Sequence, residues 1–86
     1  MPTISMFYGI IIQMFWDDHA PPHFHVEYAE HAAIISIQSG EVVAGRLPRR
    51  VAKLVAEWRR TCVGQLRQAW TQAQAGKAPR RIPPLE

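Results

Sequence analysis

The spacing of hydrophobic and polar positions changes once along this chain, near residue 47. Before that point, apolar residues alternate with polar ones or run together over short stretches, which predicts β-strands. After it, apolar residues recur every three or four positions, which predicts an amphipathic helix. The pattern therefore predicts an α+β fold, in which an antiparallel sheet of three to four strands is followed by one long C-terminal amphipathic helix packed on it.

Strand-like patterns occupy four segments of the first half. The first, "MFYGIIIQMFW", is apolar on both faces, as in a strand that is covered on both sides. The second alternates regularly and places His23, His25 and Glu27 together on one face. The Ser-Gly pair at 39–40 predicts a tight turn before a short last strand. The predicted strands cover residues 6–16, 23–29, 33–38 and 41–46.

The helix pattern begins at Pro48 and ends before Gly76, a typical C-cap. An unbroken helix of this length would extend about 42 Å, whereas the predicted strands span only about 20 Å. The sheet would then leave the second half of the apolar stripe, including Leu66 and Trp70, uncovered. Two explanations stay open. Either this half contacts a second small protein or another copy of the chain, or the helix breaks near Gly64 and folds back.

Size and composition predict one small domain. The chain has 86 residues, of which 48% are hydrophobic and 20% charged; we expect a domain over residues 1–76 and a mobile, basic, proline-rich tail over residues 77–86. The one cysteine, Cys62, lies on the apolar stripe and is predicted to be buried, unreactive and unable to form an internal disulfide. No apolar run approaches the roughly 20 residues of a membrane span, and "MPTIS" lacks the basic region of a signal peptide. We therefore expect a cytoplasmic protein with no membrane partner.

Acidic and basic residues separate along the chain. Residues 1–45 contain five acids and no Lys or Arg, a formal charge of −5, whereas residues 46–86 have a formal charge of +8. Basic side chains of the predicted helix gather opposite its apolar stripe and crowd its first turn, where the helix dipole favours anions. A nucleic acid or an acidic protein would bind such a face, although the polar face of any amphipathic helix is charged. The candidate anion-binding residues are Arg49, Arg50, Lys53, Arg60 and Arg67.

The segment "DDHAPPHFHV", residues 17–26, contains three of the four histidines. Two imidazoles on one strand face can bind a transition metal, with Asp18 or Glu27 adding an oxygen ligand. The same histidines could instead transfer protons in a metal-free hydrolase or ribonuclease, or only stabilise a turn, with Asp17 and Asp18 as turn residues or as orienters of a histidine. No cofactor other than such a metal is expected. The candidate catalytic residues are His19, His23 and His25, and the candidate metal ligands are His23 and His25.

Three stretches of the chain carry a family resemblance. They are "FYGIIIQMFWDDHAPPHFHVEY" at residues 7–28, then "GEVVAGRLP", then "EWRRTCVGQLRQAW" on the predicted helix. Together they resemble the bacterial family catalogued as domain of unknown function 4160, over nearly the whole chain. Between the two helix tryptophans the family commonly has a His or aromatic residue and then a Glu-Leu pair. This chain has Thr61, Cys62 and Gln65-Leu66 there, so no helix acid or helix histidine is expected to act.

The resemblance implies a small cytoplasmic protein that is often encoded beside a second small protein, in pairs suspected of toxin–antitoxin-like action. It implies no established activity. We therefore expect one half of such a two-protein pair, acting through protein–protein binding, with nucleic acid as a second candidate partner. The alternative is a small hydrolase or ribonuclease that uses the histidine cluster, with or without a metal.

Overall fold

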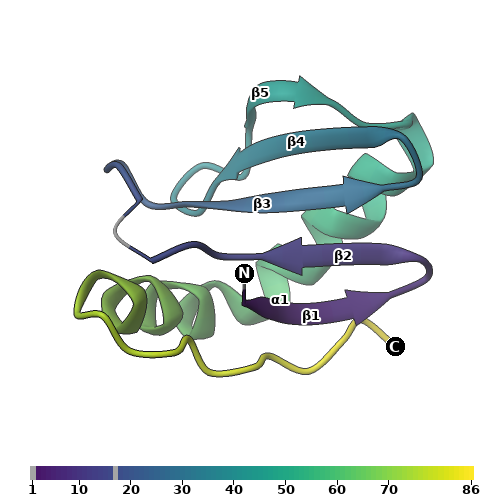
Figure 1. Cartoon of the computed structure of the whole chain (residues 1–86). Helices are drawn as coiled ribbons and strands as arrows, with labels where there is room; N and C mark the ends of the chain where they lie inside the picture. The colour runs from purple at the N-terminus through teal and green to yellow at the C-terminus, as the bar shows by residue number, and fades with distance from the viewer. Residues whose placement is uncertain (1, 17) are drawn as a thin grey trace.

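The chain folds into a five-stranded antiparallel sheet followed by one helix, in a computed structural model that describes residues 2–16 and 18–86 (Figure 1). The α+β class, the antiparallel sheet and the C-terminal helix are as predicted, but the strands number five rather than three to four. Asp17, expected to act in a turn, lies outside the described residues. The elements are β1 (Thr3–Phe7), β2 (Ile10–Gln13), β3 (His23–Tyr28), β4 (His31–Ser36), β5 (Val42–Arg46) and α1 (Arg49–Gln74), with the strands paired in sequence order.

The additional strand arises because the first apolar segment forms a hairpin and not one long strand. Phe7 pairs with Ile10, so that only Tyr8 and Gly9 form the turn. Both have positive φ angles, 51° and 77°, as a type I′ turn requires. Tyr rarely adopts this conformation, and for this reason the sequence pattern did not reveal the turn.

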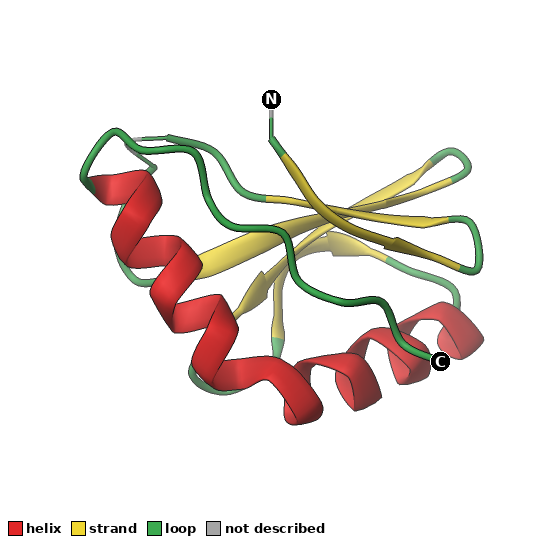
Figure 2. Cartoon of the chain, turned by 90° about the horizontal axis from the view of Figure 1, so that it is seen from below, coloured by secondary structure: helices red, strands yellow, loops and turns green. Residues whose placement is uncertain are grey.

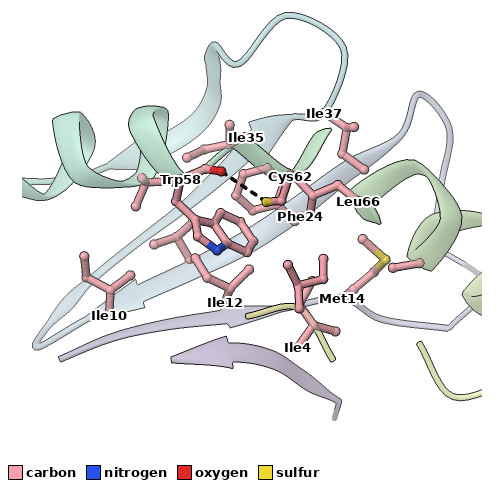
Figure 3. Packing of buried hydrophobic residues seen from close by; sticks show 14 of the residues in the cluster. Ile4, Ile10, Ile12, Met14, Phe24, Ile35, Ile37, Trp58, Cys62 and Leu66 are labelled. Atoms are coloured by element: carbon pink, nitrogen blue, oxygen red, sulfur yellow. Dashed lines mark hydrogen bonds between the residues drawn. The ribbon is translucent and has the colours of Figure 1, made fainter. Parts of the chain in front are cut away.

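The core lies between one face of the sheet and α1, whereas no described element covers the other face (Figures 1 and 2). Trp58 is at its centre and is 1% exposed. Measured between centroids, its ring lies 5.5 Å from the ring of Phe7. It lies 5.8 Å from the ring of Phe24 (Figure 3). The alternation in β3 therefore has the predicted outcome: Phe24 and Val26 enter the core, and the two histidines face the other way.

Helix α1 bends sharply at Cys62, whose φ of −132° and ψ of 23° are not helical (Figure 2). The Thr61 hydroxyl and the Cys62 thiol both donate to the carbonyl oxygen of Trp58, at 2.7 and 3.1 Å. Such side-chain bonds to preceding carbonyls compete with the helical hydrogen bonds and bend helices. Of the two explanations for the length of the helix, the break near Gly64 is correct, and it lies at Cys62, two residues before that glycine.

The bend lets the second half of α1 pack on the core. Leu66 is fully buried and Trp70 is 8% exposed within this single chain. The expectation that these two residues remain uncovered is therefore wrong, because it assumed a straight helix of about 42 Å that extends past the sheet. The interface that we predicted at Leu66 and Trp70 loses the exposed surface on which it was based.

Residues 77–86 are extended, but they pack against the domain and do not form a free tail. The Ile82 N–H donates to the carbonyl of Ile4 in β1 at 2.8 Å, and the indole N–H of Trp58 donates to the carbonyl of Pro83 at 3.0 Å. Ile82 itself is 4% exposed. The segment thus runs along β1 and closes that edge of the sheet (Figure 1). No helix among the described residues has the length and apolar character that crossing a bilayer requires.

Candidate functional site

The loop between β2 and β3 is held by the C-terminal end of α1. The side-chain amide of Gln74 donates to the backbone carbonyl of Asp18 at 2.9 Å. The indole N–H of Trp16 donates to the carbonyl of Lys77, just beyond the helix, at 2.8 Å. These two bonds join residues that are 56 and 61 positions apart in sequence, and they fix the loop that carries Asp18 over the start of β3.

Asp18 meets two histidines of β3 at one carboxylate oxygen. Its Oδ2 lies 2.8 Å from Nε2 of His23 and 3.0 Å from Nε2 of His25. One ligand atom from each of the three residues lies within 4.8 Å of the others. The side chains are 20%, 13% and 25% exposed for Asp18, His23 and His25, so the cluster is shielded but accessible.

The orientation of both rings is fixed by neighbours outside the cluster. Nδ1 of His23 lies 2.8 Å from the carbonyl oxygen of Pro21, and the His23 ring packs on Trp70 with centroids 5.1 Å apart. The His25 ring meets Phe15 edge-on, at 4.3 Å between centroids and 84° between planes. Trp70, predicted as an interface residue, thus supports the histidine cluster from the helix.

The carboxyl group of Asp18 is held in its ionised form. Burial alone would raise its pKa, but hydrogen bonds from His25, the His19 N–H and His23, together with the charge of His23, lower the pKa below its ordinary value. His19, one of the three predicted catalytic histidines, contributes its backbone N–H to Asp18 Oδ1 at 2.9 Å. Its side chain is exposed and is not part of the group of three ligand residues.

An open hollow of about 350 Å³ lies beside the cluster. One wall is the turn of residues 18–23 with His25, and the other is formed by Ile34, Ser36 and Val43 of β4 and β5. The hollow is on the side of the sheet opposite to α1, because His25 pairs with Ile34 across that face. A small group of a substrate can therefore reach both histidines without opening the core.

The candidate basic residues do not form one continuous stripe. Arg49, Arg50 and Lys53 line a separate hollow of about 490 Å³ at the start of α1. Arg67 aligns with the other basic residues only if α1 is treated as one straight helix. The bend at Cys62 ends that alignment at residue 61. Arg67 instead lines a hollow of about 270 Å³ with Pro22 and Trp70, next to the histidine cluster. Arg60 is exposed on the first half of the helix.

A model of the family described as Domain of unknown function (DUF4160) matches residues 9–71. The chain belongs to this family. The matched part of this DUF4160 chain includes Asp18, both histidines of the cluster and Trp70, so the cluster is inside the family's domain. No curated protein and no solved structure matched the chain.

One member of the site was misread from the sequence of this DUF4160 chain: Trp70 was predicted as an interface residue. Asp18 was among the residues considered, as a turn residue, as an orienter of a histidine or as one of two possible oxygen donors, and the structure places its carboxylate on both histidines. The sequence Asp-x₄-His-x-His could have indicated that Asp18 lies near the histidines. The turn that contains the two prolines connects Asp18 to the start of β3, where both histidines lie. No local signal pointed to Trp70, since its position depends on the bend at Cys62.

Proposed function

We propose that this DUF4160 chain is a small hydrolase that activates water or a substrate hydroxyl at the Asp18–His23–His25 cluster. One observation carries the proposal: two imidazoles converge on a single carboxylate oxygen at the edge of an open hollow of about 350 Å³. Imidazole is the side chain that most readily exchanges a proton near neutral pH, and an ionised carboxylate fixes its orientation.

A purely structural role for the cluster requires only that the rings hold the loop, and it does not require an exposed ring beside a hollow. Here the His23 ring packs on Trp70 of α1, but His25 lies on the opposite face of β3 from the core residues Phe24 and Val26, and a quarter of its side chain is exposed. The hollow also combines apolar side chains with the Ser36 hydroxyl, as small-molecule sites commonly do. These features support a catalytic site over a turn-fixing one.

The test is a panel of hydrolysis assays on oligoribonucleotides, phosphodiesters, carboxyl esters and peptides. We expect turnover of one of these classes, and His25→Ala should lower kcat/KM at least about 100-fold, a usual cost of losing an acid–base group. His31→Ala is the matched control, because among the described residues the charged partner of His31 is the exposed Glu30, at 3.9 Å, and His31 is not part of the cluster. Absence of turnover in every class, or equal losses for the two variants, would contradict the proposal.

Membership of a two-protein pair that binds nucleic acid is a second candidate function. It is favoured by the hollow at the start of α1, where the three cations Arg49, Arg50 and Lys53 face the single acid Glu57 and the first turn of the helix has no acidic residue. A partner would need another contact than Leu66 and Trp70, since both are buried. Binding of a labelled RNA duplex should weaken steeply with salt, and Arg49→Gln with Lys53→Gln should reduce both affinity and salt dependence. Salt-independent binding, or no binding, would exclude it.

A further inference from the structure

We propose that Asp18, His23 and His25 bind one divalent transition-metal ion through two imidazole nitrogens and one carboxylate oxygen. The proposal deepens the proposed hydrolase and rests on it for the role of the ion, although binding of the ion does not require hydrolysis. Three steps of geometry lead to it.

The first step is the donor and acceptor balance of His23. Its Nδ1 lies 2.8 Å from the Pro21 carbonyl, which can only accept, so Nδ1 bears the proton. In a neutral ring, Nε2 would then present its lone pair to Oδ2 of Asp18, at 2.8 Å. Two lone pairs at this distance require a positive charge between them, either a second proton on the ring or a metal ion.

The second step is that the same carboxylate oxygen serves both rings. Nε2 of His25 also faces Oδ2 of Asp18, at 3.0 Å. Ligand atoms of a tetrahedral zinc site, at about 2.0–2.1 Å from the ion, are about 3.3 Å apart. Because the three atoms already lie within 4.8 Å of one another, side-chain shifts of about 1 Å or less complete this geometry. Imidazole nitrogens favour transition metals over magnesium or calcium, which select oxygen ligands.

The third step is the support around the ligands. The carbonyl of Pro21 on Nδ1 of His23 is the kind of outer partner that fixes the tautomer and orientation of a ligating histidine. The His19 N–H occupies Oδ1 of Asp18 at 2.9 Å and leaves Oδ2 for the ion, while Gln74 holds the Asp18 backbone. The loop and both rings are therefore arranged before any ion binds.

The ligand set leaves a coordination position for chemistry. Only these three residues form such a group among the described residues, and Glu27, the other oxygen donor considered from the sequence, is outside it. A four-coordinate ion would keep one position free toward the hollow beside Ser36 and Val43. In catalytic zinc sites that position holds a water molecule that ionises near neutral pH.

The experiment uses the full chain, without a polyhistidine tag and stripped with a chelator. A calorimetric titration of the metal-free protein with Zn²⁺ should show one binding site. With Co²⁺, visible absorption should report a four- or five-coordinate ion with nitrogen ligands. His25→Gln and Asp18→Asn should each weaken Zn²⁺ binding at least about tenfold, and His31→Ala should leave it unchanged. Circular dichroism of each metal-free variant checks folding, and His25→Gln is preferred over changes at His23 because His23 also packs on Trp70.

The outcomes separate this proposal from the proposed function. If wild type and the His23→Ala, His25→Ala double variant bind Zn²⁺ and Co²⁺ equally, the proposal is overturned and the cluster is bridged by protons. Hydrolysis that persists in excess chelator would overturn the catalytic role of the ion, while leaving the hydrolase intact. Stoichiometric metal binding that the variants abolish, without hydrolysis of any substrate class, would support the metal site and contradict the hydrolase.

Discussion

Cys62 is the residue at which α1 changes direction, and its environment keeps the thiol protonated. Burial raises the pKa of Cys62 from 9.0 to about 11, although the charge of Arg59 acts in the opposite direction. The thiol donates to the Trp58 carbonyl at 3.1 Å (Figure 3). The sequence predicted a buried, unreactive thiol from its place on the apolar stripe. The burial is confirmed, at 5% exposure, and the raised pKa favours the less reactive protonated thiol.

The raised pKa of Cys62 gives a testable pH dependence. Because the folded state holds this proton more tightly than the unfolded state, the contribution to stability is complete below about pH 9 and is lost as the pH rises to about 11. Denaturant unfolding of wild type should therefore lose more stability over this interval than that of Cys62→Ala. A thiol reagent at pH 8 should react slowly with the folded chain and rapidly in denaturant. Equal pH profiles for the two proteins would contradict the assignment.

At the scale of elements, the pattern predicted which faces are buried and the turn before the last strand, but it missed the first hairpin turn. The apolar stripe from Val51 to Ala73 is buried, as its spacing indicated. The bend affects one residue, so that within each half of the helix the apolar side chains still share one face. The hairpin at Tyr8-Gly9 and the bend at Cys62 each depend on a single backbone conformation that many sequences avoid. The histidines of the site were found by alternation, whereas the role of Asp18 depends on a bond to Gln74 from the other end of the chain.

Two glycines distinguish a position where the fold needs a glycine from one where it does not. Gly64 lies in the second half of α1 with no described atom within 4 Å of an added Cβ, so Gly64→Ala should stabilise the chain by about 0.5–1 kcal/mol through helix propensity. Gly45 in β5 has a φ of 79°, and its added Cβ would meet the carbonyl of Ala32. Gly45→Ala should therefore destabilise by more than about 1 kcal/mol. Urea unfolding measures both, and a destabilised Gly64→Ala would place the cause of the bend at Gly64 instead of Cys62.

At the scale of the whole molecule, the C-terminal segment is part of the domain. It covers the β1 edge of the sheet, while β5 remains as the other edge. Covering an edge removes unpaired backbone groups that would otherwise pair with other chains. Its proline-rich composition predicted an extended conformation, but no local pattern could show that Ile82 packs on the core, because that contact joins the two ends of the sequence.

The packing of Ile82 can be measured directly. Ile82→Ala should cost about 2–4 kcal/mol of unfolding free energy, as for other buried isoleucines. The neighbouring Arg81→Ala should stay within about 0.5 kcal/mol, because Arg81 is exposed. Equal, small effects of the two substitutions in urea unfolding would mean that residues 77–86 form a free tail in solution.

The C-terminal end of α1 packs on the core and also positions the loop that carries Asp18. Gln74 holds the Asp18 carbonyl at 2.9 Å but has no direct contact with the histidine rings among the described hydrogen bonds. Loss of a residue that orients a metal ligand usually costs 10–100-fold in affinity. Gln74→Ala should therefore weaken Zn²⁺ binding about tenfold while the melting temperature of the metal-free protein changes little. Gln68→Ala, on an exposed position of the same helical segment, is the control. If both variants bind Zn²⁺ like wild type, the loop is positioned by β2 and β3 alone, and the helix serves only the core.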